Sequence, residues 1–150
     1  MIRKEISIDI ARPVHEVFAF VDDPSKAPEW LGLCISLEQI SPGPKHIGTQ
    51  LHYTYRNLQS GQTGEMDGVV TAYETNKHLA MKYGDKMFEV GLDFWFSASA
   101  TGTALKHIAE IEPKSFLTKL MSPMIATAMD GQLNQDMEKL KTLLESQSHS

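Results

Sequence analysis

The stretch ARPVHEVFAFVDDPSKAPEW, residues 11–30, decides the fold. Pro13 suits the first turn of a helix, because its ring fixes φ at about −65° and its missing N–H would have no partner there. One helical face then collects apolar side chains at i, i+3, i+4 and i+7, namely Val14, Val17, Phe18 and Val21. The stretch therefore predicts an amphipathic helix that starts near Pro13.

A second short helix is predicted in the same stretch. Asp23 stands before Pro24, and this pair is typical of a helix N-cap with proline at the first position. We expect Pro28 to limit the length of this helix, because proline interrupts a helix interior. The pattern predicts two short, proline-opened helices, the second of which ends near Trp30.

The segments on both sides of this stretch alternate as β-strands do. Residues 3–10 carry isoleucine at every second position, which predicts a half-buried strand. Further alternating segments follow between residues 34 and 112, at 51–55, 66–74, 78–83, 87–96 and 103–111, with turns expected at Gly61–Gly64 and at residues 84–86. Because their connections are short, we expect an antiparallel meander with one wet face.

The C-terminal part is helical. Ser122 and Pro123 indicate an N-cap followed by proline, and a helix is predicted from about residue 123 to 145. One stripe of this helix is apolar, at Ala126, Met129, Leu133, Met137, Leu140 and Leu144. Leu117, Leu120 and Met121 belong to a different face, so we expect the chain to bend or break near Pro123.

These elements predict an α+β fold, in which an antiparallel sheet of about seven strands packs against a long C-terminal helix. A chain of 150 residues is expected to form a single domain, residues 1–150, with a polar, disordered tail at residues 146–150. The net charge of −5 argues against nucleic acid and against an anionic membrane surface as partners. No apolar stretch is long enough for membrane insertion. We expect a cytoplasmic monomer or weak homodimer without a disulfide, because Cys34 is the single cysteine.

Several motifs resemble the START-like helix-grip superfamily, and within it the polyketide cyclase/dehydrase-like group. The matching residues are ISIDIA followed by RPVHEVFAFVDDPSKAPEW, Gly48-Thr49 before a strand, Gly68 to Glu74, Gly102-Thr103 before the last strand, and the closing LKTLLE. The resemblance implies a curved sheet wrapped on the long helix, with the two short helices closing one end opposite that helix. It places Trp30 at the mouth or floor of a cavity, although Trp30 would also suit a core plug.

A hydrophobic small molecule, lipid or aromatic, is the partner that these features predict. The candidate ligand-binding residues lie on the apolar faces of the strands and of the long helix: Trp30, Tyr53, Tyr55, Met81, Tyr83, Phe94, Leu105, His107, Ile125 and Met129. The alternative for this set is that its members simply fill the core. No metal, nucleotide or other cofactor is expected, because the histidines lack metal-binding spacing and GQTG and ATGT lack a phosphate-binding lysine.

His107 is the candidate catalytic residue, because it interrupts a run of apolar inward positions. It would act as a polar anchor for a ligand or as a general acid/base, or it would be a core histidine whose partner is a tyrosine or a backbone carbonyl. Asp130, beside the helix stripe, would be a cavity base or a solvated surface acid. Asp93 and Trp95 should face outward unless a bulge shifts the register.

Three functions remain open at this point. The first is binding of a hydrophobic molecule between sheet and helix. The second is a cyclase or dehydratase acting on an aromatic or polyketide substrate, which would need two convergent polar groups such as His107 with a tyrosine or Asp130. The third is a protein-interaction module of the co-chaperone kind, which a collapsed interior would favour.

Overall fold

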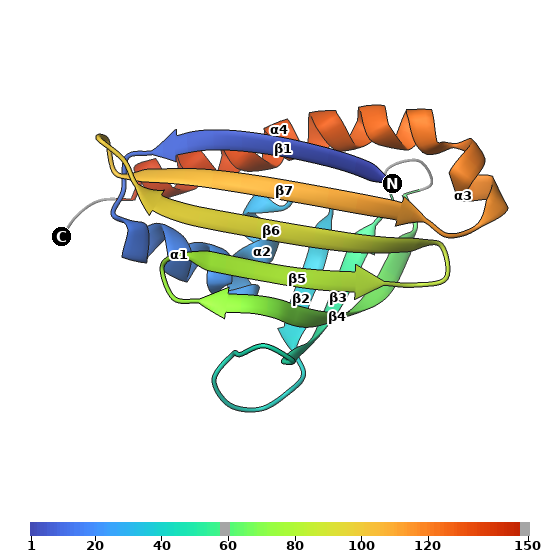
Figure 1. Ribbon diagram of the computed structural model, residues 1–150, viewed down its shortest axis with the longest axis horizontal. Helices are drawn as coiled ribbons and strands as arrows, with labels where there is room; N and C mark the ends of the chain where they lie inside the picture. The colour runs from blue at the N-terminus through green and yellow to red at the C-terminus, as the bar shows by residue number, and fades with distance from the viewer. Residues whose placement is uncertain (58–60, 148–150) are drawn as a thin grey trace.

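Seven strands form one antiparallel sheet in the order β1-β7-β6-β5-β4-β3-β2 (Figure 1). The computed structural model describes residues 1–57 and 61–147, so part of the predicted disordered tail lies outside the described residues. The strands are β1 (Ile2–Ile10), β2 (Cys34–Gln39), β3 (Gln50–Arg56), β4 (Thr63–Glu74), β5 (His78–Gly84), β6 (Phe88–Ala98) and β7 (Thr103–Pro113). The predicted sheet is confirmed.

The stretch at residues 11–30 carries the chain from one edge of this sheet to the other. It folds into α1 (Val14–Asp22), the 3-10 helix η1 (Pro24–Lys26) and α2 (Ala27–Trp30). β1 is one edge strand and pairs with the last strand, β7, whereas β2 is the opposite edge strand. The two strands that the stretch joins are therefore not neighbours, and the short helices cross the sheet between them.

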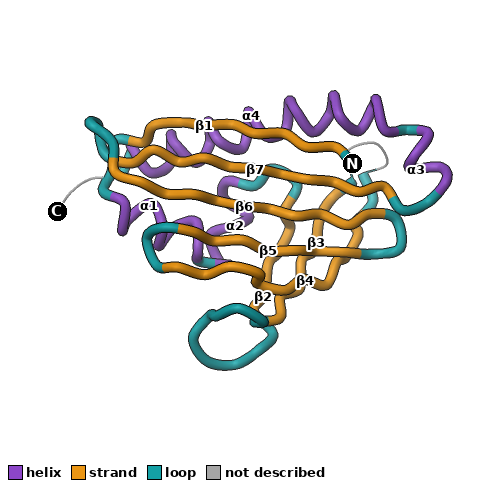
Figure 2. Tube along the Cα trace, in the orientation of Figure 1, coloured by secondary structure: helices purple, strands orange, loops and turns teal. Residues whose placement is uncertain are grey.

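All the main helices cover the same face of the sheet (Figure 2). The long helix is α4 (Ser122–Glu145), and it follows the short α3 (Phe116–Leu120). The short helices lie beside α4 and not opposite to it as we had expected, because Asp136 of α4 accepts a hydrogen bond from the backbone N–H of Gly32, just after α2, at 2.9 Å. A buried carboxylate needs such a partner. This hydrogen bond connects the end of α2 to the long helix.

The second short helix and the start of α4 differ in detail from the prediction. The helix that begins at Pro24 is η1, which is capped by Asp23 and ends at Lys26, before Pro28; Pro28 itself lies in the first turn of a separate helix, α2, where proline loses no hydrogen bond. Ser122 is the first residue of α4, and its hydroxyl donates to the Thr118 carbonyl at 3.4 Å instead of capping. The capping box lies one helix earlier, where Ser115 accepts from the Thr118 N–H. The predicted break is confirmed at Met121, between α3 and α4.

The strands differ from the prediction at one turn. Gly64, expected in a turn, lies within β4 opposite Tyr55. A Cβ at Gly64 would stand 2.6 Å from the Tyr55 ring, so only glycine lets this ring cover the strand. The predicted outward register around Asp93 is confirmed, because β6 pairs with β5 and β7 without a shift. Asp93 contacts His78 Nε2 at 2.6 Å, and the His78 ring stacks on Trp95 with centroids 3.5 Å apart.

Half of the interface between sheet and helices is filled by closely packed side chains. Phe18 of α1 meets the Phe96 and Tyr73 rings edge to face, with centroids 5.1 and 5.8 Å away. Met137, Leu140 and Leu144 of α4 are at most 1% exposed. Burying one such leucine stabilises the fold by about 1.5–3 kcal/mol. The stretch at residues 11–30 thus supplies much of this filled half.

Candidate functional site

A cavity of about 340 Å³ lies between the other half of the sheet and the N-terminal half of α4. Its walls are mainly aromatic and aliphatic. The sheet contributes Leu37, Tyr53, Tyr55, Met66, Tyr83, Phe88, Val90, Leu92, His107, Ala109 and Ile111, and α4 contributes Ile125, Ala128, Met129, Gln132, Leu133 and Asp136. Arg56 and Met87 also line it and are exposed, so the cavity opens to solvent.

The inner end of the cavity lies at one pair of stacked rings. Along β6 the cavity-lining residues end at Leu92, and along β7 they end at His107. The next inward residue of β6 is Phe94, whose ring stacks on His107 with centroids 4.1 Å apart and an interplanar angle of 1°. Trp30 covers Phe94 edge to face at 5.9 Å. These three rings separate the filled half of the core from the cavity.

The structure brings six of the ten predicted binding residues together. Tyr53, Tyr55, Tyr83, His107, Ile125 and Met129 line the cavity, whereas Trp30, Met81, Phe94 and Leu105 do not. The latter four are at most 7% exposed and pack in the core. Alternation along a strand indicates which face a side chain occupies, but not whether the helix above it leaves space. Trp30 thus corresponds to the core plug that we considered as the alternative.

His107 presents a hydrogen-bond acceptor to the cavity. Its Nδ1 lies 3.0 Å from the backbone oxygen of Asp93, and because a carbonyl only accepts, Nδ1 carries the proton. Burial lowers the pKa of His107 to about 4, against the opposing effects of the Asp93 carbonyl and carboxylate. The imidazole is therefore neutral at pH 7 with Nε2 unprotonated. No group in the described part of the chain bonds to Nε2, and none of the three tyrosines is its partner.

Three tyrosines form an aromatic wall on β3 and β5. The rings of Tyr53 and Tyr55 stack at 5.8 Å, and Tyr83 lies 5.4 Å from Tyr53. The Tyr55 hydroxyl donates to Asp85 at 3.3 Å, and that of Tyr83 points to Met81 Sδ at 3.4 Å. Burial raises the pKa of both Tyr53 and Tyr83, so these hydroxyls stay protonated.

Asp136 is the functional candidate that the sequence analysis missed. It is 6% exposed and lines the cavity, and its Oδ1 accepts from Gly32 N–H at 2.9 Å and from Gln132 Nε2 at 2.8 Å. Burial raises the pKa of Asp136, although these two hydrogen bonds act in the opposite direction. Its position, three residues after Leu133 and four before Leu140, places it within the apolar stripe and was a usable signal. Asp130 instead is a surface acid, whose side chain is 62% exposed and lies 4.0 Å from Lys4.

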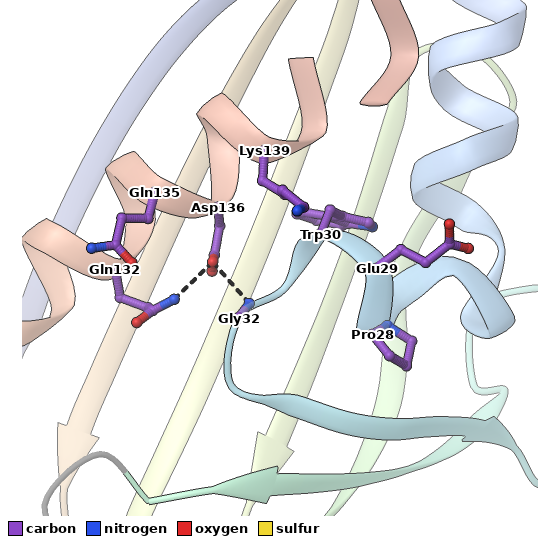
Figure 3. Close-up of a pocket in the computed structure, with 8 residues that line it drawn as sticks. All are labelled: Pro28, Glu29, Trp30, Gly32, Gln132, Gln135, Asp136 and Lys139. Carbon is purple, nitrogen blue, oxygen red and sulfur yellow. Dashed lines mark hydrogen bonds between the residues drawn. The ribbon is translucent and has the colours of Figure 1, made fainter. Parts of the chain in front are cut away.

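A smaller pocket of about 320 Å³ lies on the other side of Asp136 (Figure 3). It shares Asp136 and Gln132 with the large cavity and is also lined by Trp30, Glu29 and Lys139. Asp136 accepts hydrogen bonds from Gly32 N–H and from Gln132 Nε2 where the two pockets meet. A Cβ on Gly32 would stand 2.5 Å from Gln132 Nε2, so a larger residue there would require the end of the Gln132 side chain to move.

The family is identified by a match along nearly the whole chain. The model of the family described as "Polyketide cyclase / dehydrase and lipid transport" matches residues 1–145. The chain belongs to this family. This match confirms the predicted resemblance. A separate search of curated proteins found no match. In the described residues no helix is long and apolar enough to cross a bilayer.

Several solved structures share the fold of this chain. A START superfamily protein from Mycobacterium smegmatis matches with a TM-score of 0.79 and 16% identity, covering 97% of this chain and 98% of that one. A protein from Thermus thermophilus matches with a TM-score of 0.76 and 14% identity, covering 97% and 99%. The di-domain ARO/CYC StfQ of the steffimycin biosynthetic pathway matches with a TM-score of 0.76 and 11% identity over 96% of this chain and 51% of that one. These likenesses establish the START-like fold.

In this polyketide cyclase-family chain, a metal site would require a group of ligands close together, and a nucleophilic cysteine would require a thiolate. No group of three or more His, Cys, Asp or Glu that could hold a metal ion occurs within residues 1–57 and 61–147. Cys34 is buried, and burial together with the negative charge of Asp136 raises the pKa of its thiol to about 11. The thiol is thus protonated at pH 7. The cavity is lined by His107, Asp136 and the three tyrosines, and also by the polar side chains of Arg56, Asn57, Thr118 and Gln132.

Proposed function

We propose that the protein binds an apolar, ring-containing small molecule that carries one hydroxyl or N–H donor. The observation that carries this proposal is an aromatic and aliphatic cavity of about 340 Å³ that ends at the neutral, unprotonated Nε2 of His107. The apolar walls would take up the rings. The acceptor at the inner end would select ligands that can donate to it, because a buried acceptor without a partner is costly.

The family and the fold support this proposal. The family description includes lipid transport as well as polyketide cyclase and dehydrase, and both kinds of ligand are largely apolar. An open cavity also argues against the interaction-module alternative, which we expected to have a collapsed interior. The aromatic wall of Tyr53, Tyr55 and Tyr83 favours a flat, ring-containing ligand over a flexible chain.

The test begins with native mass spectrometry of the purified protein, which would reveal a co-purifying molecule. Binding is then measured by fluorescence with two matched probes, naphthol and naphthalene, which differ in a single hydroxyl. We expect naphthol to bind more tightly to the wild type, and we expect His107→Leu to remove this preference, because leucine offers no acceptor. Met129→Trp should fill the cavity and abolish binding of both probes. Equal affinity of the wild type for the two probes would contradict the role of His107.

A second candidate function is catalysis on an aromatic or polyketide substrate. It is favoured by the two polar groups that line one cavity, His107 and Asp136, of which Asp136 has a raised pKa that suits a general acid/base. The test is turnover of a linear poly-β-ketone thioester, followed by mass spectrometry. We expect Asp136→Asn to abolish turnover, whereas the matched surface variant Asp130→Asn should keep it. Equal turnover by both variants would exclude Asp136.

A further inference from the structure

The short helix α3 has its apolar side chains on the outside. Phe116, Leu117 and Leu120 are 79%, 61% and 63% exposed. The buried residue of this helix is Thr118, which is 2% exposed and whose hydroxyl contacts the Met87 carbonyl at 3.4 Å. A surface helix of a globular protein normally buries its leucines and exposes its threonines. The sequence of α3 therefore suits a surface that contacts something apolar.

The exposed apolar surface extends beyond α3. Met87, in the turn between β5 and β6, is 43% exposed, and Met124, in the first turn of α4, is 59% exposed. The Met87 carbonyl also accepts from the Lys114 N–H at 2.8 Å, so this turn is held against the start of α3 at one end of the molecule (Figure 1). We call the five side chains Met87, Phe116, Leu117, Leu120 and Met124 the apolar patch. Large exposed apolar side chains that gather at one end of a molecule favour an interaction site.

Three lysines lie close to residues of the apolar patch in the sequence, and Nζ of one of them, Lys114, donates to the Asp85 carbonyl at 2.8 Å. Lys86, Lys114 and Lys119 are exposed, and none of them forms an ion pair within the described part of the chain. Most other lysines do pair with a carboxylate, as Lys77 does with Glu74 at 3.7 Å. The acids at this end are occupied: Asp85 caps its own turn through the N–H groups of Met87 and Phe88, and Glu112 lies 3.5 Å from the N-terminal amine.

We propose that the apolar patch docks on the surface of an anionic phospholipid bilayer. The apolar side chains would enter the boundary between headgroups and acyl chains, while the three lysines contact the lipid phosphates. The net charge of −5 does not oppose this arrangement, because charge acts over about 10 Å at moderate salt and the end that carries the patch is locally basic. Docking involves the surface only and needs no spanning helix.

A second copy of the chain fits this patch less well than a bilayer does. In a two-fold dimer the same patch faces itself, which would bring the like-charged Lys86, Lys114 and Lys119 of both copies close together. The patch also borders the cavity, since Met87 belongs to both, and Thr118 and Met121 of the same region line the cavity. A bilayer at this position would meet the cavity opening.

The experiment is vesicle flotation of the full chain with phosphatidylcholine vesicles, with and without phosphatidylglycerol, at low and high salt. We expect the wild type to float with the anionic vesicles at low salt and to be released at high salt. Leu117→Ser combined with Leu120→Ser should abolish flotation, and Lys119→Glu should weaken it roughly fivefold or more. The matched controls are Ile40→Ser, an exposed apolar residue elsewhere, and Lys77→Glu, at the opposite end of the sheet; both should float as the wild type does.

Three results would overturn the docking proposal. No flotation with anionic vesicles at low salt would exclude docking, and equal loss in the control variants would exclude the patch as its site. A dimer in gel filtration that the double variant dissociates, with no flotation, would assign the patch to a second copy. Docking does not rest on the proposed function, because the double variant should still bind naphthol in solution. If the wild type does not bind naphthol, the cavity proposal is contradicted and the docking proposal is unaffected.

Discussion

Polar residues within the apolar faces determine the chemistry of the cavity. His107 is 1% exposed and Asp136 is 6% exposed, and each uses part of its hydrogen-bonding capacity on the backbone of a neighbouring element. The Nδ1–H of His107 is fixed by the Asp93 carbonyl, and Asp136 Oδ1 is fixed by the Gly32 N–H. This leaves Nε2 and the second carboxylate oxygen for a ligand. The residues are thus oriented by the fold before any ligand arrives.

The first prediction concerns the protonation of His107. Its pKa in the folded protein is lowered to about 4 from a model-peptide value of 6.5, so the unfolded chain binds the proton more tightly. Stability should therefore fall as the pH drops from 6.5 to 4, by about 3 kcal/mol, and this contribution should not change further below pH 4. Urea unfolding of the wild type and of His107→Asn across this range measures it, because asparagine keeps a donor for the Asp93 carbonyl but does not titrate.

The quantity to compare is the difference in unfolding free energy between the wild type and His107→Asn at each pH, because the other groups titrate equally in both proteins. The His52 contribution should change in the opposite direction, because the hydrogen bonds that its ring donates to Glu65 and Asp67 raise its pKa, but this exposed group is present in both proteins. A wild type whose stability follows the same pH dependence as that of His107→Asn would show that the imidazole is not held neutral.

The second prediction concerns the indole of Trp30. Its Nε1 has no hydrogen-bond partner among the described residues, and the side chain is 3% exposed. Trp30→Phe removes a donor that forms no hydrogen bond in the structure and keeps a ring against Phe94. We therefore expect the unfolding free energy to fall by less than about 1.5 kcal/mol. Trp30→Ala should cost about 3–5 kcal/mol, because it leaves a cavity. Chemical unfolding of both variants measures this; a Phe variant as unstable as the Ala variant would show that Nε1 has a partner.

At the scale of elements, α4 divides into a packed half and a cavity-lining half. Leu133 lines the cavity, whereas Leu140, two turns later, is 0% exposed and surrounded by the filled core. We predict that Leu140→Ala costs about 2–5 kcal/mol of unfolding free energy, since it creates a new void. Leu133→Ala should cost only roughly 1 kcal/mol, because one side of Leu133 already faces empty space.

The same pair of variants separates stability from binding. Naphthol affinity should change in Leu133→Ala and should be unchanged in Leu140→Ala when both are measured well below their melting temperatures. Equal destabilisation by the two substitutions would mean that the cavity is closed in solution.

The elements themselves could largely be predicted from the sequence, and the cavity only in part. Alternation in β6 places Phe88 and Phe94 on the same face, but Phe88 lines the cavity and Phe94 packs in the core, because α2 covers only one end of the strand. The local pattern located the start of α4 to within one residue but wrongly assigned Ser122 as its cap, because hydrogen bonding continues from α3 and makes a cap unnecessary. Asp136 was missed although it interrupts the helix stripe just as His107 interrupts its strand.

At the scale of the whole molecule, the cavity lowers the stability of the fold, and the packed half of the core must offset this loss. A cavity lined by apolar side chains lacks the contacts that a filled core has. The sheet and the helices nevertheless form one unit, because the rings of Trp30, Phe94 and His107 close the packed half independently of the cavity. The protein should therefore remain folded without a ligand and gain stability when one binds.

The last prediction uses a substitution that fills this space. Ala109 on β7 is 2% exposed and lines the cavity opposite Leu92. Ala109→Leu adds three carbons that can occupy empty volume, so we expect the unfolding free energy to rise by roughly 1–2 kcal/mol while naphthol binding is lost. The control is Ala27→Leu, because Ala27 is 3% exposed in α2 and lines neither pocket; overpacking there should cost about 1–3 kcal/mol. Urea unfolding with and without naphthol measures both effects. If Ala109→Leu destabilises the protein as much as Ala27→Leu does, the space beside Ala109 is already filled, and the stability of the fold does not depend on the cavity as we infer.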